Sequence, residues 1–296
     1  MYRESGKLFA QHKRMNSEPL GFSIIIPTYN RGYILDEAIS SVLNQQAQVD
    51  IEIIVVDDGS TDNTQKVIDS VGDERIKYFS QSNQGPSSAR NLGLKNATKD
   101  WIVYLDSDNK LYPNYFKVIS DYILSNPDMT YSMVRAHKTY VLYENGKVIQ
   151  TKEDMGSHLE EVSVQDLFHY KAIFDVNGFF HRRDIVGDIK WDEKLARIED
   201  WDFFMSIAER HPNGFIYISQ PVLDYKMRFG TDGILSNSSY IQWAEAFEYI
   251  YQKHKNDKLL QGQQWYPAKV EYYRQKQIDF EAGRVPPPHL RIFLRD

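Results

Sequence analysis

Near its start the chain reads Phe22-Ser23-Ile24-Ile25-Ile26-Pro27, and this apolar run sets the architecture that the sequence predicts. Its three isoleucines follow one another without a polar residue between them, and Pro27 interrupts the run. A continuous β-branched run predicts a strand that is buried on both faces, as in a parallel sheet. The rest of the sheet can be traced outward from this strand.

Helix and strand patterns alternate regularly after this strand. Apolar residues at helical spacing cover residues 34–43, 64–71 and 87–97, and strand-like runs cover residues 51–56, 76–79 and 101–105. This order predicts a parallel, doubly wound sheet with right-handed crossovers. Ligands of such sheets bind beyond the carboxyl ends of the strands. Two acidic clusters, Asp57-Asp58 and Asp106-Ser107-Asp108, directly follow strands, so we expect both at the ligand edge.

The second half of the chain is less regular. Its patterns predict helices over residues 115–124, 162–169 and 201–210, strands near 131–135, 139–143, 147–151 and 215–218, and a turn at Asn145-Gly146. Residues 239–283 are rich in Tyr and Trp at irregular helical spacing. Together the patterns predict an α/β fold with a Rossmann-like mixed sheet, flanking helices and a helical C-terminal extension.

Composition excludes several classes of protein. The chain has 296 residues, of which 42% are hydrophobic and 26% charged, as expected for a globular protein. A net charge of -6 argues against binding of nucleic acid, and the absence of cysteine excludes disulfides and zinc–thiolate sites. No apolar stretch is long enough to span a membrane. The polar residues 1–21 are either a loosely docked leader or an arm that contacts a membrane surface or a partner.

Asp106-Ser107-Asp108 places two carboxylates on one turn after a buried strand. Such oxygen donors suit Mg²⁺ or Mn²⁺, with water and a diphosphate in the remaining positions. An Asp-rich surface turn is the alternative. An EF-hand loop is excluded, because Lys110 and Leu111 stand where that loop needs Asp or Asn followed by Gly. Lys110 also breaks the pattern of a haloacid-dehalogenase-type phosphatase.

Two further clusters suit either a nucleotide or the local fold. Asp58 can accept the imide N–H of a uracil ring, whereas the neighbouring Gly59 and Thr61 are explained by a turn and a helix cap. The Gly85-Pro86 turn, followed by small residues, lets the backbone approach a ligand closely. Arg90, in the predicted helix that follows, either faces that ligand or caps the sheet.

Ile198-Glu199-Asp200-Trp201-Asp202 is the last acidic cluster. Acidic residues in the first turn of a helix interact favourably with the helix dipole, which is one sufficient explanation. In the other explanation, one of these carboxylates is the general base that takes a proton from an acceptor hydroxyl. The cluster alone does not decide between the two.

Together these motifs resemble the inverting family 2 glycosyltransferases of GT-A fold. Five motifs occur in the family's order, which makes the resemblance specific over residues 22–230. They are Ile26-Pro27-Thr28-Tyr29-Asn30-Arg31, Val55-Val56-Asp57-Asp58-Gly59-Ser60-Thr61-Asp62, Asn83-Gln84-Gly85 with Ala89-Arg90-Asn91-Leu92-Gly93, Leu105-Asp106-Ser107-Asp108, and Trp191-Asp192-Glu193 with Glu199-Asp200-Trp201-Asp202.

The resemblance implies a domain division and a reaction. Residues 1–21 would be a leader, 22–235 a GT-A catalytic domain and 236–296 the helical extension. The catalytic domain would divide into a nucleotide-binding half, 22–114, and an acceptor half, 115–235. The reaction would move a sugar from a nucleotide-sugar donor, a UDP-sugar on family grounds, to an acceptor hydroxyl of a glycan or lipid-linked glycan.

The resemblance also implies a role for each site residue. Asp200 would be the catalytic base, with Glu199 beside it. Asp108 and Asp106 would bind Mn²⁺ or Mg²⁺, with Asp108 as the direct ligand. The residues implied to bind the nucleotide are Pro27, Thr28, Tyr29, Asn30, Arg31, Asp58, Gly85, Arg90, Asp106 and Ser107.

Two departures from the family pattern matter. The sequence lacks the Gln-x-x-Arg-Trp motif and the membrane helices of processive members, which favours a single-addition enzyme. Many relatives carry a His in a Tyr-Arg-x-His context, where this chain has Tyr225-Lys226-Met227-Arg228. Arg228 is either a contact of the diphosphate or a surface arginine. His181 is either a second candidate for that contact or a structural histidine.

Expectations about location, partners and rival functions complete the prediction. We expect a cytoplasmic protein, with peripheral contact at the inner face of the membrane through residues 290–295 left open. The aromatic tail is either a packing helix pair or a surface that binds acceptor or forms a homo-oligomer. A nucleotidyltransferase is disfavoured, because Pro27-Thr28-Tyr29-Asn30-Arg31 lacks the glycine-rich loop of that class. A non-catalytic protein that binds nucleotide sugars remains the other alternative.

Overall fold

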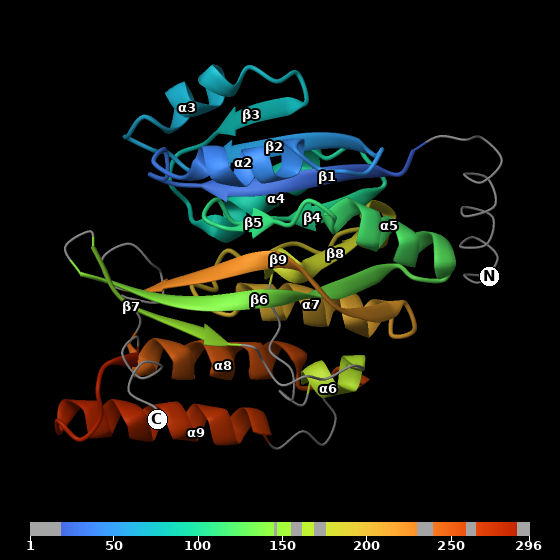
Figure 1. Ribbon diagram of the computed structural model, residues 1–296. Helices are drawn as coiled ribbons and strands as arrows, with labels where there is room; N and C mark the ends of the chain where they lie inside the picture. Colours follow the sequence, from blue (N-terminus) through green and yellow to red (C-terminus); the bar gives the residue numbers. More distant parts are fainter. Residues whose placement is uncertain are drawn as a thin grey trace.

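The computed structural model describes residues 19–144, 147–154, 162–168, 176–229, 239–258 and 265–288. Most of the predicted leader, the Asn145-Gly146 turn and residues 290–295 lie outside the described residues. The described residues form one mixed sheet of nine strands with helices on both faces (Figure 1). The predicted α/β class with a mixed sheet is confirmed.

The first half of the sheet is parallel, as predicted. Strands β1 (Gly21–Thr28), β2 (Asp50–Asp57), β3 (Ile76–Ser80) and β4 (Trp101–Tyr104) lie in the order β3-β2-β1-β4. Every residue of β1 is buried. The cause is the position of β1 between β2 and β4, with packed helices above and below.

Alternate side chains of β1 reach opposite faces of the sheet. Phe22, Ile24 and Ile26 share a hydrophobic cluster with helices α2 (Leu35–Leu43) and α3 (Thr64–Val71). Ile25 joins the other cluster, on the face covered by α4 (Pro86–Asn96). Gly93 of α4 lies so close to β1 that a Cβ atom there would be 2.4 Å from Cγ2 of Ile25. This close approach positions α4, which carries Arg90.

The second half of the sheet mixes directions and follows β4. Strand β8 (Phe179–Arg182) is antiparallel to β4 and to β6 (Tyr131–Glu144). Strand β6 runs parallel to β9 (Phe215–Phe229). Strand β5 (Lys110–Leu111) pairs antiparallel with β9, and β7 (Lys147–Asp154) pairs antiparallel with β6. The remaining elements of this half are α5 (Tyr115–Ser125), α6 (Val164–Phe168), the short helices Val176–Gly178 and Arg183–Ile185, and α7 (Glu199–Arg210).

Two strand predictions in this half were wrong in detail. Residues 131–135 and 139–143 were expected as two strands but form the single strand β6, and β9 continues past Pro221 instead of ending before it. The pairing jumps from Val134–Ile218 to Ala136–Leu223. This bulge sets Pro221 outside the ladder, where its missing N–H leaves no hydrogen bond unmade.

The predicted helical extension is a pair of helices, α8 (Tyr240–His254) and α9 (Trp265–Glu281). Ser239 and Gln242 form a capping box at the start of α8. Phe247 and Ile250 of α8 are buried in the same hydrophobic cluster as Trp201 and Phe204 of α7. Figure 1 shows α8 between α7 and α9. The extension therefore packs directly on the helix that carries the Glu199-Asp200 motif.

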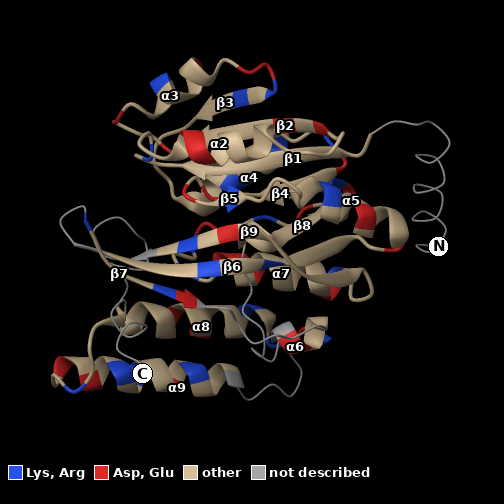
Figure 2. Cartoon of the chain, in the orientation of Figure 1, with Lys and Arg blue, Asp and Glu red and all other residues tan. Residues whose placement is uncertain are grey.

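Charged residues are spread over the whole described chain. Figure 2 shows acidic and basic segments interspersed over both halves of the sheet and over the helices. Among the described helices, none is both long enough and apolar enough to cross a membrane.

His181 on β8 is a structural histidine in the sheet core. It is fully buried, its Nδ1 donates to the carbonyl of Arg182 (2.8 Å), and its Nε2 accepts from the hydroxyl of Tyr104 (3.0 Å). Burial disfavours the charged ring and lowers the pKa of His181 to about 4. The ring is therefore neutral at pH 7, and both nitrogens are engaged in the core.

We predict that His181 makes the fold sensitive to acid. Below pH 6.5 the unfolded chain takes up a proton that the folded chain excludes, so stability falls as the pH drops from 6.5 towards 4. Each bound proton changes the free energy of unfolding by about 1.4 kcal/mol per pH unit. Between pH 7 and pH 4.5 the wild type should lose about 2 kcal/mol more than His181→Gln in urea titrations. Equal losses in wild type and His181→Gln would contradict the prediction.

Candidate active site

The segments that we expect to form the ligand edge meet at the carboxyl ends of the parallel strands. Thr28, the last residue of β1, pairs in register with Asp57, the last residue of β2. Strand β4 ends beside them, and Leu105 after it donates to the carbonyl of Ile25 on β1 (3.0 Å). The segments that follow β1, β2 and β4 therefore meet at one edge of the sheet, as their sequence positions predicted.

Hydrogen bonds tie the segment after β1 to the segment after β2. Asn30 has a left-handed backbone (φ 51°), which asparagine tolerates better than most residues. Its N–H donates to Oγ of Ser60 (2.8 Å), and its Oδ1 accepts from the N–H of Thr61 (2.8 Å). Gly32 N–H also donates to Asp62 (3.0 Å). These hydrogen bonds connect the two segments into one wall of the edge. Tyr29, in the first segment, is 46% exposed.

The two adjacent carboxylates after β2 have different surroundings. Asp57 accepts from the N–H of Ser60 (2.8 Å) and from the hydroxyl of Tyr78 (2.9 Å). Burial and the neighbouring Asp57 carboxylate together raise the pKa of Tyr78 to about 12. Asp57 therefore holds the local fold together.

Asp58 organises the loop that leads into α4. Its carboxylate accepts from the side chain of Gln81 (2.7 Å) and from the backbone N–H groups of Gln84 (2.9 Å) and Gly85 (2.7 Å). Gly85 has φ 91°, a conformation that favours glycine, and Pro86 begins the helix. A carboxylate offers roughly four lone-pair positions, so three bonds leave one for a ligand.

Arg90 on α4 joins two acidic motifs that are far apart in the sequence. One terminal nitrogen donates to Oδ1 of Asp106 (3.0 Å), and the other donates to Oε1 of Glu199 (2.9 Å). The guanidinium also lies over the ring of Trp191, 4.7 Å from its centre. Burial opposes the charge, but the two carboxylates outweigh it and raise the pKa of Arg90. Arg90 is therefore a buried, permanent cation between the two motifs.

Asn177 holds Asp106 from the other side. Its Oδ1 accepts from the backbone N–H of Asp106 (2.7 Å), and its Nδ2 donates to Oδ2 of Asp106 (3.1 Å). Both carboxylate oxygens of Asp106 are thus engaged. The sequence analysis missed Asn177, because nothing in the surrounding sequence separates it from an ordinary turn residue.

Unfilled hydrogen-bonding capacity is found around this edge. Buried Oγ1 of Thr28, Oγ of Ser87 and Nδ2 of Asn109 have no hydrogen-bond partner among the described residues. Asn109 still fixes the turn after Asp108, because its Oδ1 accepts from the backbone N–H of Lys226 on β9 (2.8 Å). Buried polar atoms without a partner also occur elsewhere in the described chain, for example the hydroxyls of Tyr115 and Tyr131, so they do not by themselves mark a ligand site.

The three acids at the start of α7 differ in environment. Glu199 is bound to Arg90, and Asp202 is completely buried against His254 and Lys253 of α8. Asp200 is partly exposed, and its Oδ1 accepts from the N–H of Trp201 (2.8 Å). Asp202 is therefore engaged in buried ion pairs with α8. Glu199 and Asp200 are both partly exposed, and Glu199 is the one that binds Arg90.

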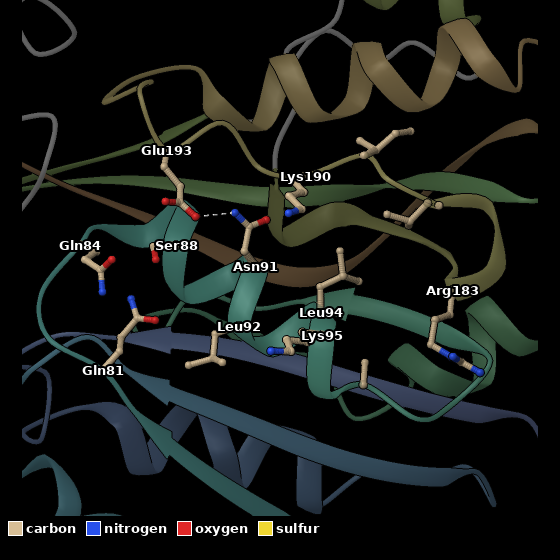
Figure 3. A pocket seen from close by; sticks show the side chains of 14 residues that line it. Gln81, Gln84, Ser88, Asn91, Leu92, Leu94, Lys95, Arg183, Lys190 and Glu193 are labelled. Carbon is tan, nitrogen blue, oxygen red and sulfur yellow. Dashed lines mark hydrogen bonds between the residues drawn. The ribbon is translucent and has the colours of Figure 1, made fainter.

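A pocket of about 700 Å³ lies along α4, and its lining includes neither the Asp106-Ser107-Asp108 turn nor Glu199-Asp200. Gln81 and Gln84, which hold Asp58, line one part, and Asn91, Lys95 and Lys190 line others (Figure 3). Asn91 also donates to Glu193 across the pocket wall (2.9 Å), as the dashed line in Figure 3 shows.

The side chain of Arg228 lies outside the described residues. Its backbone lies in β9 and pairs with Val141 of β6. Its predicted contact with a diphosphate stays a prediction.

The metal prediction can be compared with the donor atoms present. Among the described residues, no group of three or more His, Asp or Glu side chains is arranged to hold a metal ion. Mg²⁺ and Mn²⁺ sites of diphosphate-binding enzymes use one or two carboxylates and take their other ligands from phosphate and water. Asp106 and Asp108, two residues apart at a strand end, fit such a site.

Comparison with known proteins identifies the family. The family model described as "Glycosyl transferase family 2" matches residues 23–189, which is more than half of the chain. The chain belongs to glycosyltransferase family 2. It is 29% identical over 239 residues to the minor teichoic acid biosynthesis protein GgaA of Bacillus subtilis. That match covers 78% of this chain but 51% of GgaA, so the chain spans about half the length of that relative.

Solved structures confirm the GT-A fold. Residues 1–349 of S. aureus TarS in complex with UDP-GlcNAc superpose with a TM-score of 0.65 at 20% identity, covering 88% of this chain and 73% of that one. The mannosyltransferase PcManGT of Pyrobaculum calidifontis, in complex with GDP-Man and Mn²⁺, gives a TM-score of 0.54 at 15% identity and covers 99% and 87%. Likeness at this level of identity shows the fold.

We predict that Arg90→Lys lowers the free energy of unfolding by about 2 kcal/mol. The single ammonium of lysine cannot replace the two terminal guanidinium nitrogens, each of which binds one carboxylate. Urea unfolding at pH 7 measures the loss. The matched control is the reverse exchange, Lys95→Arg, on the exposed face of the same helix, which should change stability by less than about 0.5 kcal/mol. Wild-type stability in Arg90→Lys would contradict a stabilising bridge.

Proposed function

We propose that the chain is an inverting, metal-dependent glycosyltransferase that moves a sugar from a UDP-sugar to a hydroxyl of a glycan or lipid-linked glycan. The observation that carries the proposal is the Arg90 bridge. It holds the Asp106-Ser107-Asp108 turn and the Glu199-Asp200 turn together at the carboxyl edge of a parallel sheet. A donor-binding motif and a base motif on one edge are what transfer to a hydroxyl requires.

Binding of the nucleotide is supported by the wall that follows β1 and β2. The remaining acceptor position on Asp58 suits the imide N–H of uracil, and the exposed ring of Tyr29 suits contact with a planar base. Asp106, held by Arg90 and Asn177, suits the ribose hydroxyls. The UDP-GlcNAc complex of TarS, which shares the fold, supports a UDP-sugar as donor.

Asp108 is the proposed direct ligand of Mn²⁺ or Mg²⁺, at a partly exposed position on the same turn as Asp106, which Arg90 and Asn177 hold in place. When bound, the ion neutralises the charge that develops on the departing diphosphate. The Mn²⁺ in the PcManGT complex supports a divalent ion in this fold. The turn that carries Asp108 is held in place by Asn109.

Asp200 is the proposed base. It is partly exposed, whereas Glu199 is bound to a permanent cation and Asp202 is buried in ion pairs. A partly exposed carboxylate on the first turn of α7 can be reached by an acceptor and can take a proton from its hydroxyl. Attack by that oxygen opposite the leaving diphosphate inverts the anomeric carbon.

The acceptor is proposed from relatives and from the reaction class. GgaA is named for teichoic acid biosynthesis, which supports a glycan-type acceptor for this chain. A protein that only binds nucleotide sugars is the alternative. A wild-type chain that binds UDP tightly but releases none from a panel of UDP-sugars with Mn²⁺ and acceptors would favour that alternative.

We predict that Asp200→Asn keeps the site but removes the base. The dissociation constant for UDP should stay within about twofold of wild type, while the rate of transfer falls by about 10² to 10⁴. Calorimetry measures binding, and release of UDP measures transfer. The matched control is Asp188→Asn, at an aspartate whose side chain is 85% exposed, which should behave as wild type. Normal turnover in Asp200→Asn would remove it as the base.

We predict that Asp108→Asn abolishes the metal-dependent part of UDP binding. Loss of a metal ligand should weaken binding in Mn²⁺ by at least about tenfold, to the level that wild type shows in EDTA. Calorimetric titrations with Mn²⁺ and with EDTA measure both affinities. Asp121→Asn, at a surface aspartate that is 62% exposed, is the control. An unchanged gain from Mn²⁺ in Asp108→Asn would refute the assignment.

A further inference from the structure

The C-terminal helices contact the two residues that follow the proposed base. Asp202 accepts from Nζ of Lys253 (2.8 Å) and interacts with Nε2 of His254 (2.8 Å), both on α8. Trp201 donates from its indole nitrogen to the hydroxyl of Tyr266 on α9 (2.6 Å). The first turn of α7 is thus held by the C-terminal helices as well as by the Arg90 bridge.

The same lysine also holds the motif that precedes α7. Nζ of Lys253 donates to Oδ2 of Asp192 (2.9 Å), which also accepts from the hydroxyl of Tyr249 (3.0 Å). The neighbouring Trp191 is the ring against which Arg90 packs. Lys253 therefore connects the two ends of the segment that carries the proposed base.

Burial requires that Asp202 and His254 have partners within the protein. Asp202 has no exposed surface, so its charge must be paired within the protein. His254 lies between Asp202 and Asp257; burial opposes its charge, but the two carboxylates raise its pKa. An imidazolium can donate from both nitrogens, which fits two carboxylate partners.

We infer that Lys253 and Tyr266 are positioning residues for transfer: they hold the first turn of α7, and with it Asp200, in register with the donor edge. The inference rests on the proposed function and deepens it. In this inference, the C-terminal helices contribute to the geometry of the proposed active site. Displacing a reacting group by about 1 Å can cost about 10²-fold in rate, so loss of this support should affect turnover rather than donor binding.

Lys253→Met tests the inference directly. Removing the ammonium leaves the carboxylates of Asp192 and Asp202 without the cation between them. We expect the turnover number for UDP release to fall by about 10- to 100-fold, with the KM for the donor within about twofold. Lys253→Arg should recover most of the rate, because it restores a cation at the same position. Lys255→Met, at an exposed lysine that bonds only to Gln252 among the described contacts, should match wild type.

Hydrogen exchange gives a readout that does not depend on activity. Amides of residues 199–203 should exchange faster in Lys253→Met than in wild type or Lys255→Met. Wild-type turnover in Lys253→Met would overturn the inference, as would lower turnover with unchanged exchange at 199–203. If Lys253→Met does not fold, Tyr266→Phe, which removes one hydroxyl, is judged by the same two measurements. A wild type that releases no UDP defeats the proposed function, whereas the exchange comparison still decides whether the extension holds α7.

Discussion

A single buried guanidinium sets the geometry of this molecule. Arg90 binds Asp106 at the end of β4 and Glu199 at the start of α7, residues that lie 16 and 109 positions away in the sequence. A charge buried this deeply is tolerated only when its partners are fixed. The close packing of Gly93 on Ile25 positions the helix that carries Arg90. The separation of the two acidic motifs is therefore set by the core of the sheet.

A second cation, Lys253, also binds two acidic residues around the first turn of α7. It binds Asp192 before the helix and Asp202 inside it, as Arg90 binds Asp106 and Glu199. The first turn of α7 is thus bonded both to α4 and to the C-terminal helices. Groups held by several partners on regular secondary structure are better ordered than groups carried on loops alone. In the inference drawn above, the extension supports the proposed site.

The parallel half of the sheet, and the edge at which the two acidic clusters meet, could be predicted from the sequence, because uninterrupted apolar runs specify buried strands and parallel strands gather their carboxyl ends. The different partners of neighbouring residues at that edge could not be predicted. Asp57 and Asp58 are adjacent in the sequence, yet one binds Tyr78 and the other the loop before α4. The bond between Asp202 and His254 depends on a tertiary contact that no local pattern reports. Continuation of β9 past Pro221 also depends on its partner strand.

The proposed function requires that the β4 edge present a carboxylate to a divalent ion that binds the pyrophosphate of a nucleotide. Anomalous diffraction from crystals of the full chain grown with UDP and Mn²⁺ tests this requirement. We expect a single Mn²⁺ peak bonded to the Asp108 carboxylate and to the diphosphate, with uracil beside Asp58. Bound UDP without Mn²⁺ at Asp108, or with its uracil away from Asp58, would contradict it.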